Sequence, residues 1–117
     1  MGYSTTSGRW ANTRDLPLAP SAARTTTANG TAFEPGDKAV ARLRLNVTAA
    51  SGTSPTLNVT VQTSHDGTTW RSAGTFTQAT AVSEQRATFS IDRYVRATWA
   101  IAGTTPSFTF SITGEAV

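Results

Sequence analysis

The residues best suited to chemistry are few, and three of them are consecutive. Ser64, His65 and Asp66 are the residue types of a nucleophile, a general base and an orienting acid, and His65 is the only histidine in the chain. In a catalytic triad these side chains must point at one another. Consecutive residues in a tight turn cannot do so, and Asp66-Gly67 favours such a turn. We therefore expect a hairpin turn with His65 exposed at its tip, and a protein that is not an enzyme.

Residues that hold metals or cofactors are scarce and scattered. The chain has no cysteine, and its seven acidic residues lie apart, mostly at turns, where aspartate commonly binds the local backbone. One histidine without cysteine argues against a zinc site, whereas loop acids leave a calcium site open. No glycine-rich phosphate-binding motif occurs. The sequence predicts no metal, no cofactor and no catalytic residue.

Length and composition indicate one small sheet-forming domain. The 117 residues suit a single domain. Charged residues make up 15% of the chain, against about 25% in an average soluble domain, and threonine, a β-branched residue, is abundant. A net charge of +3 is too dilute to predict a nucleic-acid partner. The first ten residues do not resemble a secretion signal, and no run of 18 apolar residues occurs. We expect a protein that is made in a cytoplasm, is not exported and has no membrane partner.

Apolar and polar residues alternate from Ala39 to the end of the chain. Such a period of two is typical of strands with one buried face, and turn signals every eight to twelve residues favour an antiparallel β-sandwich, Ig-like or jelly-roll-like. A closed barrel is the alternative. We expect a loop at residues 50–55 and a turn at 103–106. The predicted inward residues are Ala41, Leu43, Leu45, Val47, Leu57, Val59, Val61, Ala87, Phe89, Ile91, Val95, Ala97, Trp99, Ile101, Phe108, Phe110 and Ile112.

The N-terminal part of the chain lacks this alternation. Residues 1–20 end in a segment with Pro17 and Pro20, and proline disfavours both helix and central strand. The sequence therefore predicts an extended N-terminal arm over residues 1–20 and a β-sandwich domain over residues 21–117. A first strand is expected at residues 23–28, closed by the turn dipeptide Asn29-Gly30.

Aromatic and arginine residues are the candidates for contact with a partner. Trp99 shares its parity with core residues, Trp70 is expected to pack over the hairpin, and Trp10 and Tyr94 are expected to be exposed. Arg42, Arg44, Arg86 and Arg96 fall on the outward parity of their strands. They form a basic patch if those strands are neighbours, and a solvated face without a partner is the alternative. The predicted partner-binding residues are Arg9, Trp10, Arg14, Arg42, Arg44, Tyr94 and Arg96.

Three segments carry a resemblance to a known group of proteins. Residues 57–70, with their Asp-Gly-Thr-x-Trp hairpin, residues 92–99, with Arg-Tyr-Val-Arg, and residues 105–110 resemble β-sandwich proteins of tailed phages and prophages, of the head-decoration or minor capsid type. The resemblance covers about residues 39–117. It implies a virion structural protein on the outside of the capsid that docks on the shell of the major capsid protein and stabilises it, often as a homotrimer.

Two other functions remain open. The first is a β-sandwich module that binds carbohydrate or a host surface through exposed aromatic residues. The second is a head-tail joining or tail-tube component, which predicts a ring of copies in place of trimers.

Overall fold

The computed structural model describes residues 14–117, which form strands and no helix. The expected all-β, antiparallel fold is confirmed, because every pairing between strands is antiparallel. No helix long and apolar enough to cross a membrane occurs among these residues. The strands are β1 (Arg14–Asp15), β2 (Ala19–Arg24), β3 (Ala28–Asn29), β4 (Val40–Ser64), β5 (Trp70–Thr75), β6 (Ser83–Ser90) and β7 (Tyr94–Ala116).

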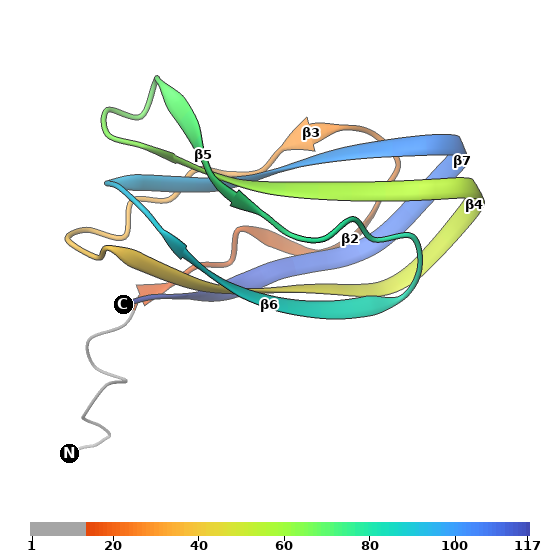
Figure 1. Cartoon of the computed structure of the whole chain (residues 1–117), viewed down its shortest axis with the longest axis horizontal. Helices are drawn as coiled ribbons and strands as arrows, with labels where there is room; N and C mark the ends of the chain where they lie inside the picture. The colour runs from red at the N-terminus through yellow and green to blue at the C-terminus, as the bar shows by residue number, and fades with distance from the viewer. Residues whose placement is uncertain (1–13) are drawn as a thin grey trace, which may run out of the picture.

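Two long strands, β4 and β7, organise the whole sheet. They pair with each other from Ala41 opposite Ala116 to Ser64 opposite Tyr94, and both bend at mid-length. Figure 1 shows the two ribbons turning back together at the same end of the molecule. The expected loop at residues 50–55 and turn at 103–106 are therefore bends within two continuous paired strands, and the prediction of separate strands there is wrong.

Glycine makes this double bend possible. Gly52 and Gly103 have φ values of 110° and 123°, a region that L side chains rarely adopt. A Cβ on Gly52 would lie 2.7 Å from the Thr105 carbonyl oxygen, and one on Gly103 would lie 2.9 Å from the Pro55 Cα. The two bends thus nest against each other, and the sheet closes over itself.

The bend gives the single sheet two layers that face one another. One layer contains β6, the first half of β4, the second half of β7, and β2 with β1. The other contains β5, the second half of β4, the first half of β7, and β3. The sheet is curled and continuous at one end, whereas a sandwich has two separate sheets.

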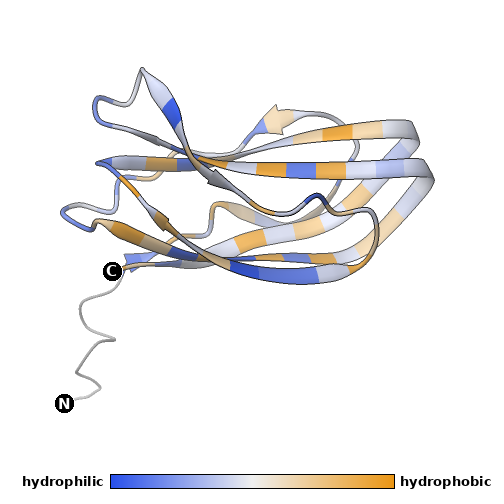
Figure 2. Ribbon diagram, viewed as in Figure 1, coloured by the Kyte–Doolittle hydropathy of each residue, from blue (hydrophilic) through white to orange (hydrophobic). Residues whose placement is uncertain are grey.

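The core lies between these layers. The predicted inward residues are buried, except that Ala87 and Ile101 are only half-buried at the margin. Figure 2 shows the corresponding alternation of apolar and polar residues along the long strands. Trp99, expected in the core, is 7% exposed and packs edge-to-face on Phe110.

The described part of the predicted arm belongs to the core. Leu16 and Leu18 are each 1% exposed, and the Leu16 N–H donates to the Gly114 carbonyl at 2.9 Å. Strand β2 already begins at Ala19, so the expected boundary at Pro20 falls inside a strand. The physical reason is that an extended chain places Leu16 and Leu18 on one face while Pro17 points to solvent. Residues 1–13, with the candidates Arg9 and Trp10, lie outside the described residues.

The chain between the arm and β4 also differs from expectation. The predicted strand at residues 23–28 is replaced by β2, which pairs with the second half of β7, and by β3, which pairs with the first half. This segment therefore crosses from one layer to the other beside the core. Gly30 allows the crossing, since a Cβ there would lie 2.9 Å from the Leu18 carbonyl oxygen and 3.2 Å from the Trp99 ring.

Candidate functional site

The Ser64-His65-Asp66 segment forms a hydrogen-bonded turn. The Ser64 hydroxyl donates to Asp66 Oδ1 at 3.0 Å and accepts from the Gly67 N–H at 2.9 Å. The N–H groups of Thr68 and Thr69 donate to the same carboxylate oxygen, each at 2.9 Å, and hold the pKa of Asp66 well below its usual range. His65 is exposed. The turn expected from the sequence is confirmed. The expectation that its side chains cannot point at one another is wrong for Ser64 and Asp66, which bind each other as well as the backbone.

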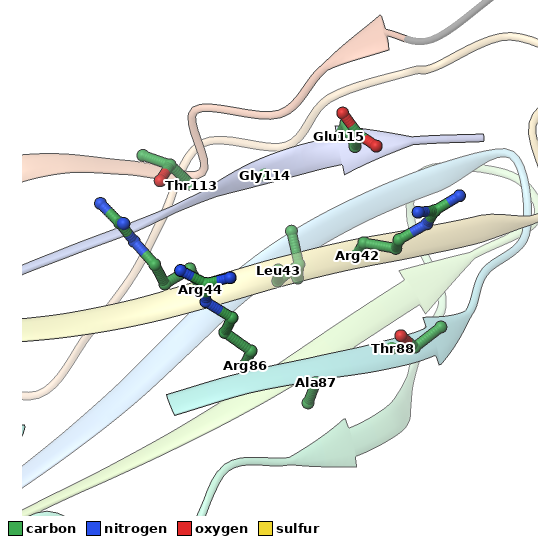
Figure 3. Close-up of a pocket in the computed structure, with 9 residues that line it drawn as sticks. All are labelled: Arg42, Leu43, Arg44, Arg86, Ala87, Thr88, Thr113, Gly114 and Glu115. Atoms are coloured by element: carbon green, nitrogen blue, oxygen red, sulfur yellow. The ribbon is translucent and has the colours of Figure 1, made fainter. Parts of the chain in front are cut away.

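Three outward arginines gather on one layer, on a surface that we call the arginine face: Arg42 and Arg44 of β4 and Arg86 of β6. Arg44 and Arg86 are paired directly across the two strands. Arg42 pairs with Thr88, two residues further along each strand on the same side of the sheet. In Figure 3 the three side chains rise from neighbouring strands, with Arg86 extending toward Arg44. The arginines line an open hollow of about 450 Å³ that also borders Gly114 and Glu115 of β7.

Acidic residues lie on the same face as this hollow, and one of them, Glu115, lines it. Glu84 forms an ion pair with Arg44, at 3.1 Å between Oε2 and Nη1. The strand register places Glu115 beside Arg42, and Asp15 of β1 beside Glu115. Three arginines therefore share the face with three carboxylates. The face is mixed in charge, with its basic part over β4 and β6 and acids toward β1 and β7.

Arg86, like Arg42, has no partner among the described residues, whereas Arg44 is paired with Glu84. Among residues 14–117 the Arg86 side chain makes no hydrogen bond or ion pair, and its cross-strand neighbour is another arginine. Like charges placed directly opposite in a sheet repel each other. An acidic group from outside the chain would relieve that repulsion.

Arg96 and Tyr94 lie on the outer side of the other layer. The pairing of Tyr94 with Ser64 and of Arg96 with Gln62 puts them over the second half of β4, and the chain bends between this part of β4 and Arg42. The outward parity of Arg96 is right, but a single patch of all four arginines is not formed. Parity along a strand identifies the inner or outer side, and it does not identify the layer.

Tyr94 is half-buried among local contacts. The Arg93 guanidinium lies 5.5 Å from the centre of its ring, and Arg93 is itself paired with Glu34 at 2.5 Å between Nε and Oε2. This pairing raises the pKa of Arg93. Arg14, the remaining described candidate, is exposed in β1, where it pairs with Ala116 at the opposite side of β7 from β4. The described candidates thus occupy three separate places.

Two arginine contacts were not foreseen from the sequence. Arg24 stacks on Trp99 and Phe110, at 4.9 and 4.5 Å from the ring centres, and donates to the Phe110 carbonyl at 2.7 Å. Arg96 stacks on Trp70 at 4.3 Å. Each contact joins residues from different strands, so only the strand pairing, which a sequence pattern does not contain, could have indicated it.

No known family model matches the chain, and no curated protein is significantly similar to it.

Proposed function

We propose that this chain is a non-enzymatic structural protein that decorates the outside of a tailed-phage head and stabilises the shell by binding the major capsid protein. The resemblance of residues 39–117 to phage head proteins suggests the setting. The observation that carries the binding role is the arginine face, where three outward arginines line an open hollow on neighbouring strands. Arginine is enriched at protein interfaces because its planar group binds carboxylates in pairs.

The mixed charge of this face favours a protein partner with a matching pattern. Arg86 and Arg42 would meet acidic side chains of the shell, while Glu115 and Asp15 would face basic ones. Such complementarity fixes the orientation of docking and rejects wrong partners. A protein that binds only the assembled shell shifts the assembly equilibrium toward the intact particle, which is how decoration stabilises it. A trimeric arrangement of copies on the shell is part of this proposal.

The carbohydrate-binding alternative has less support from the aromatic residues. The rings of Trp70 and Tyr94 each have an arginine over one side, at 4.3 and 5.5 Å. A sugar stacks on an open aromatic ring, and these two are partly covered. No feature of residues 14–117 favours the head-tail joining alternative.

Co-sedimentation with empty heads of the corresponding phage tests the proposal. The double variant Arg42→Ala/Arg86→Ala should bind about tenfold to a hundredfold more weakly, the loss expected when two interface arginines are truncated. Arg71→Ala is the matched control, because Arg71 is exposed on the other layer and paired with Asp92 at 2.7 Å. Equal binding by the double variant and the control would exclude the arginine face, and no binding of the unmodified protein to heads would exclude decoration.

A further inference from the structure

The Arg96 guanidinium is held on two sides by its own chain. Its Nε donates to Gln62 Oε1 at 2.8 Å, and its central carbon lies 4.3 Å from the centre of the Trp70 ring. Gln62 on β4 pairs with Arg96 on β7 and with Ser72 on β5, so Arg96 and Trp70 approach each other over β4 from its two sides. Stacking and the Nε bond together fix the plane of the guanidinium.

The outer end of this guanidinium has no partner in residues 14–117. Neither of its terminal nitrogens, Nη1 and Nη2, makes a hydrogen bond or ion pair there. On β4 and β7 the outward positions next to Arg96 and Gln62 are Ser64, Tyr94, Thr60 and Thr98. Glu34, which the Phe33–Val95 bridge places beside Tyr94, is paired with Arg93. Asp66, in the turn that follows Ser64, uses its carboxylate on the Thr68 and Thr69 N–H groups. A positive charge in a fixed orientation therefore faces outward with no ion-pair partner among residues 14–117.

A carboxylate is the group that fits this arrangement. Two parallel N–H groups of arginine match the two oxygens of a carboxylate, and charge-assisted bonds of this kind are stronger than neutral ones. Because Trp70 and Gln62 already restrict the side chain, less conformational entropy is lost on binding. We propose that Arg96, positioned by Trp70 and Gln62, binds an acidic side chain of a partner protein.

The neighbouring residues favour a protein over an acidic sugar as the source of this carboxylate. Arg96 itself covers one side of the Trp70 ring, where a sugar would stack. The Thr60 hydroxyl, half-exposed in the next row, provides a hydrogen-bonding group for a peptide backbone beside the carboxylate, while the neighbouring Thr98 hydroxyl donates to the Thr60 carbonyl at 3.5 Å. This site lies on the layer opposite to the arginine face and does not depend on it, so the failure of one proposal leaves the other standing.

Titration of the ¹⁵N-labelled protein with capped hexaglutamate tests the site, with capped hexaglutamine and sialyllactose as comparison ligands. The Nε–H signal of Arg96 should shift and saturate with hexaglutamate alone. Arg96→Lys keeps the charge and loses the planar group, and should weaken binding about tenfold to a hundredfold, as expected for a lost charge-assisted bond. Arg71→Lys, on the same layer but paired with Asp92, should bind as the unmodified protein does.

A second variant separates positioning from folding. Gln62→Glu places an internal carboxylate against Arg96 and should abolish hexaglutamate binding while preserving the thermal unfolding temperature. Thr104→Glu adds the same charge at the bend of β7, away from Arg96, and should leave most of the binding intact. The proposal is overturned if Arg96→Lys and Arg71→Lys bind alike, if Gln62→Glu still binds, or if sialyllactose gives the larger shift of the Arg96 signal.

Discussion

The buried N-terminal leucines give the most decisive test of the fold. Leu16 and Leu18 are each 1% exposed and lie beside the last strand of the core, where Leu16 N–H binds the Gly114 carbonyl. Replacing a buried leucine by alanine costs about 2–5 kcal/mol, from lost burial and from the cavity that remains. A domain is typically stable by only about 5–15 kcal/mol. The double variant Leu16→Ala/Leu18→Ala should therefore lose most of its stability, although neighbouring changes need not add exactly as singles do.

Urea unfolding measured by far-ultraviolet circular dichroism checks this expectation. Each single variant should lower the midpoint by about 1–3 M, given the slope usual for a domain of this size. Val82→Ala is the control, because Val82 is 65% exposed and its change should cost less than about 0.5 kcal/mol. A chain that starts at Ser21 should also be less stable than one that starts at Arg14. If the leucine variants shift the midpoint no more than Val82→Ala does, the segment is not part of the core.

Two further predictions concern backbone fit and pH. Gly114→Ala should lower the thermal unfolding temperature, because its Cβ would overlap the Arg42 carbonyl oxygen, and such overpacking costs about 1–3 kcal/mol; an unchanged temperature would mean that β4 and β7 can separate there without cost. The lowered pKa of Asp66 means that its ionised form stabilises the fold above the ordinary value of 3.8 and that this stabilisation is lost as the pH falls below it. Asp66→Asn should therefore show a smaller loss of stability between about pH 5 and 3 than the unmodified protein, and equal losses would contradict the role of the turn.

Hydrophobic alternation located the core correctly because each strand buries one face. Leu43, Val59, Phe89 and Trp99 were all assigned inward by parity, and all are buried. This pattern depends only on neighbours along the chain, since successive side chains of a strand point to opposite sides. The buried face of each strand could therefore be predicted without knowing which strands pair.

The N-terminal boundary was missed because proline was given too much weight. Leu16 and Leu18 show the same i, i+2 spacing as the later strands, but Pro17 between them indicated an interruption. Proline lacks an N–H donor, which matters only where the donor is needed. Pro17 is exposed, and Leu16, next to it, still donates to Gly114.

The composition of the two strand bends led to the wrong prediction of a loop at residues 50–55 and a turn at residues 103–106. Glycine, serine and proline around Gly52 and Gly103 are typical of loops, and the sequence does not reveal that the two stretches lie against each other. Pairing continues through the bend with register shifts, which β-bulges permit. Whether such a stretch becomes a loop or a bent strand depends on its partner, which lies about fifty residues away in the chain.

The same bend explains why one strand pair presents two unlike surfaces. The outward residues of the first half of β4, such as Arg44, lie on the outer surface of one layer. Those of the second half, such as Gln62, lie on the outer surface of the other layer. One surface mixes three arginines with three acids, whereas on the other Arg96 has no ion-pair partner among residues 14–117 and the nearby Glu34 is paired with Arg93. Two separate contacts on opposite sides of a rigid domain would make the second binding step intramolecular once the first has formed. Individually weak contacts then hold a bridging protein firmly between two partners, as the proposed decoration of a shell would require.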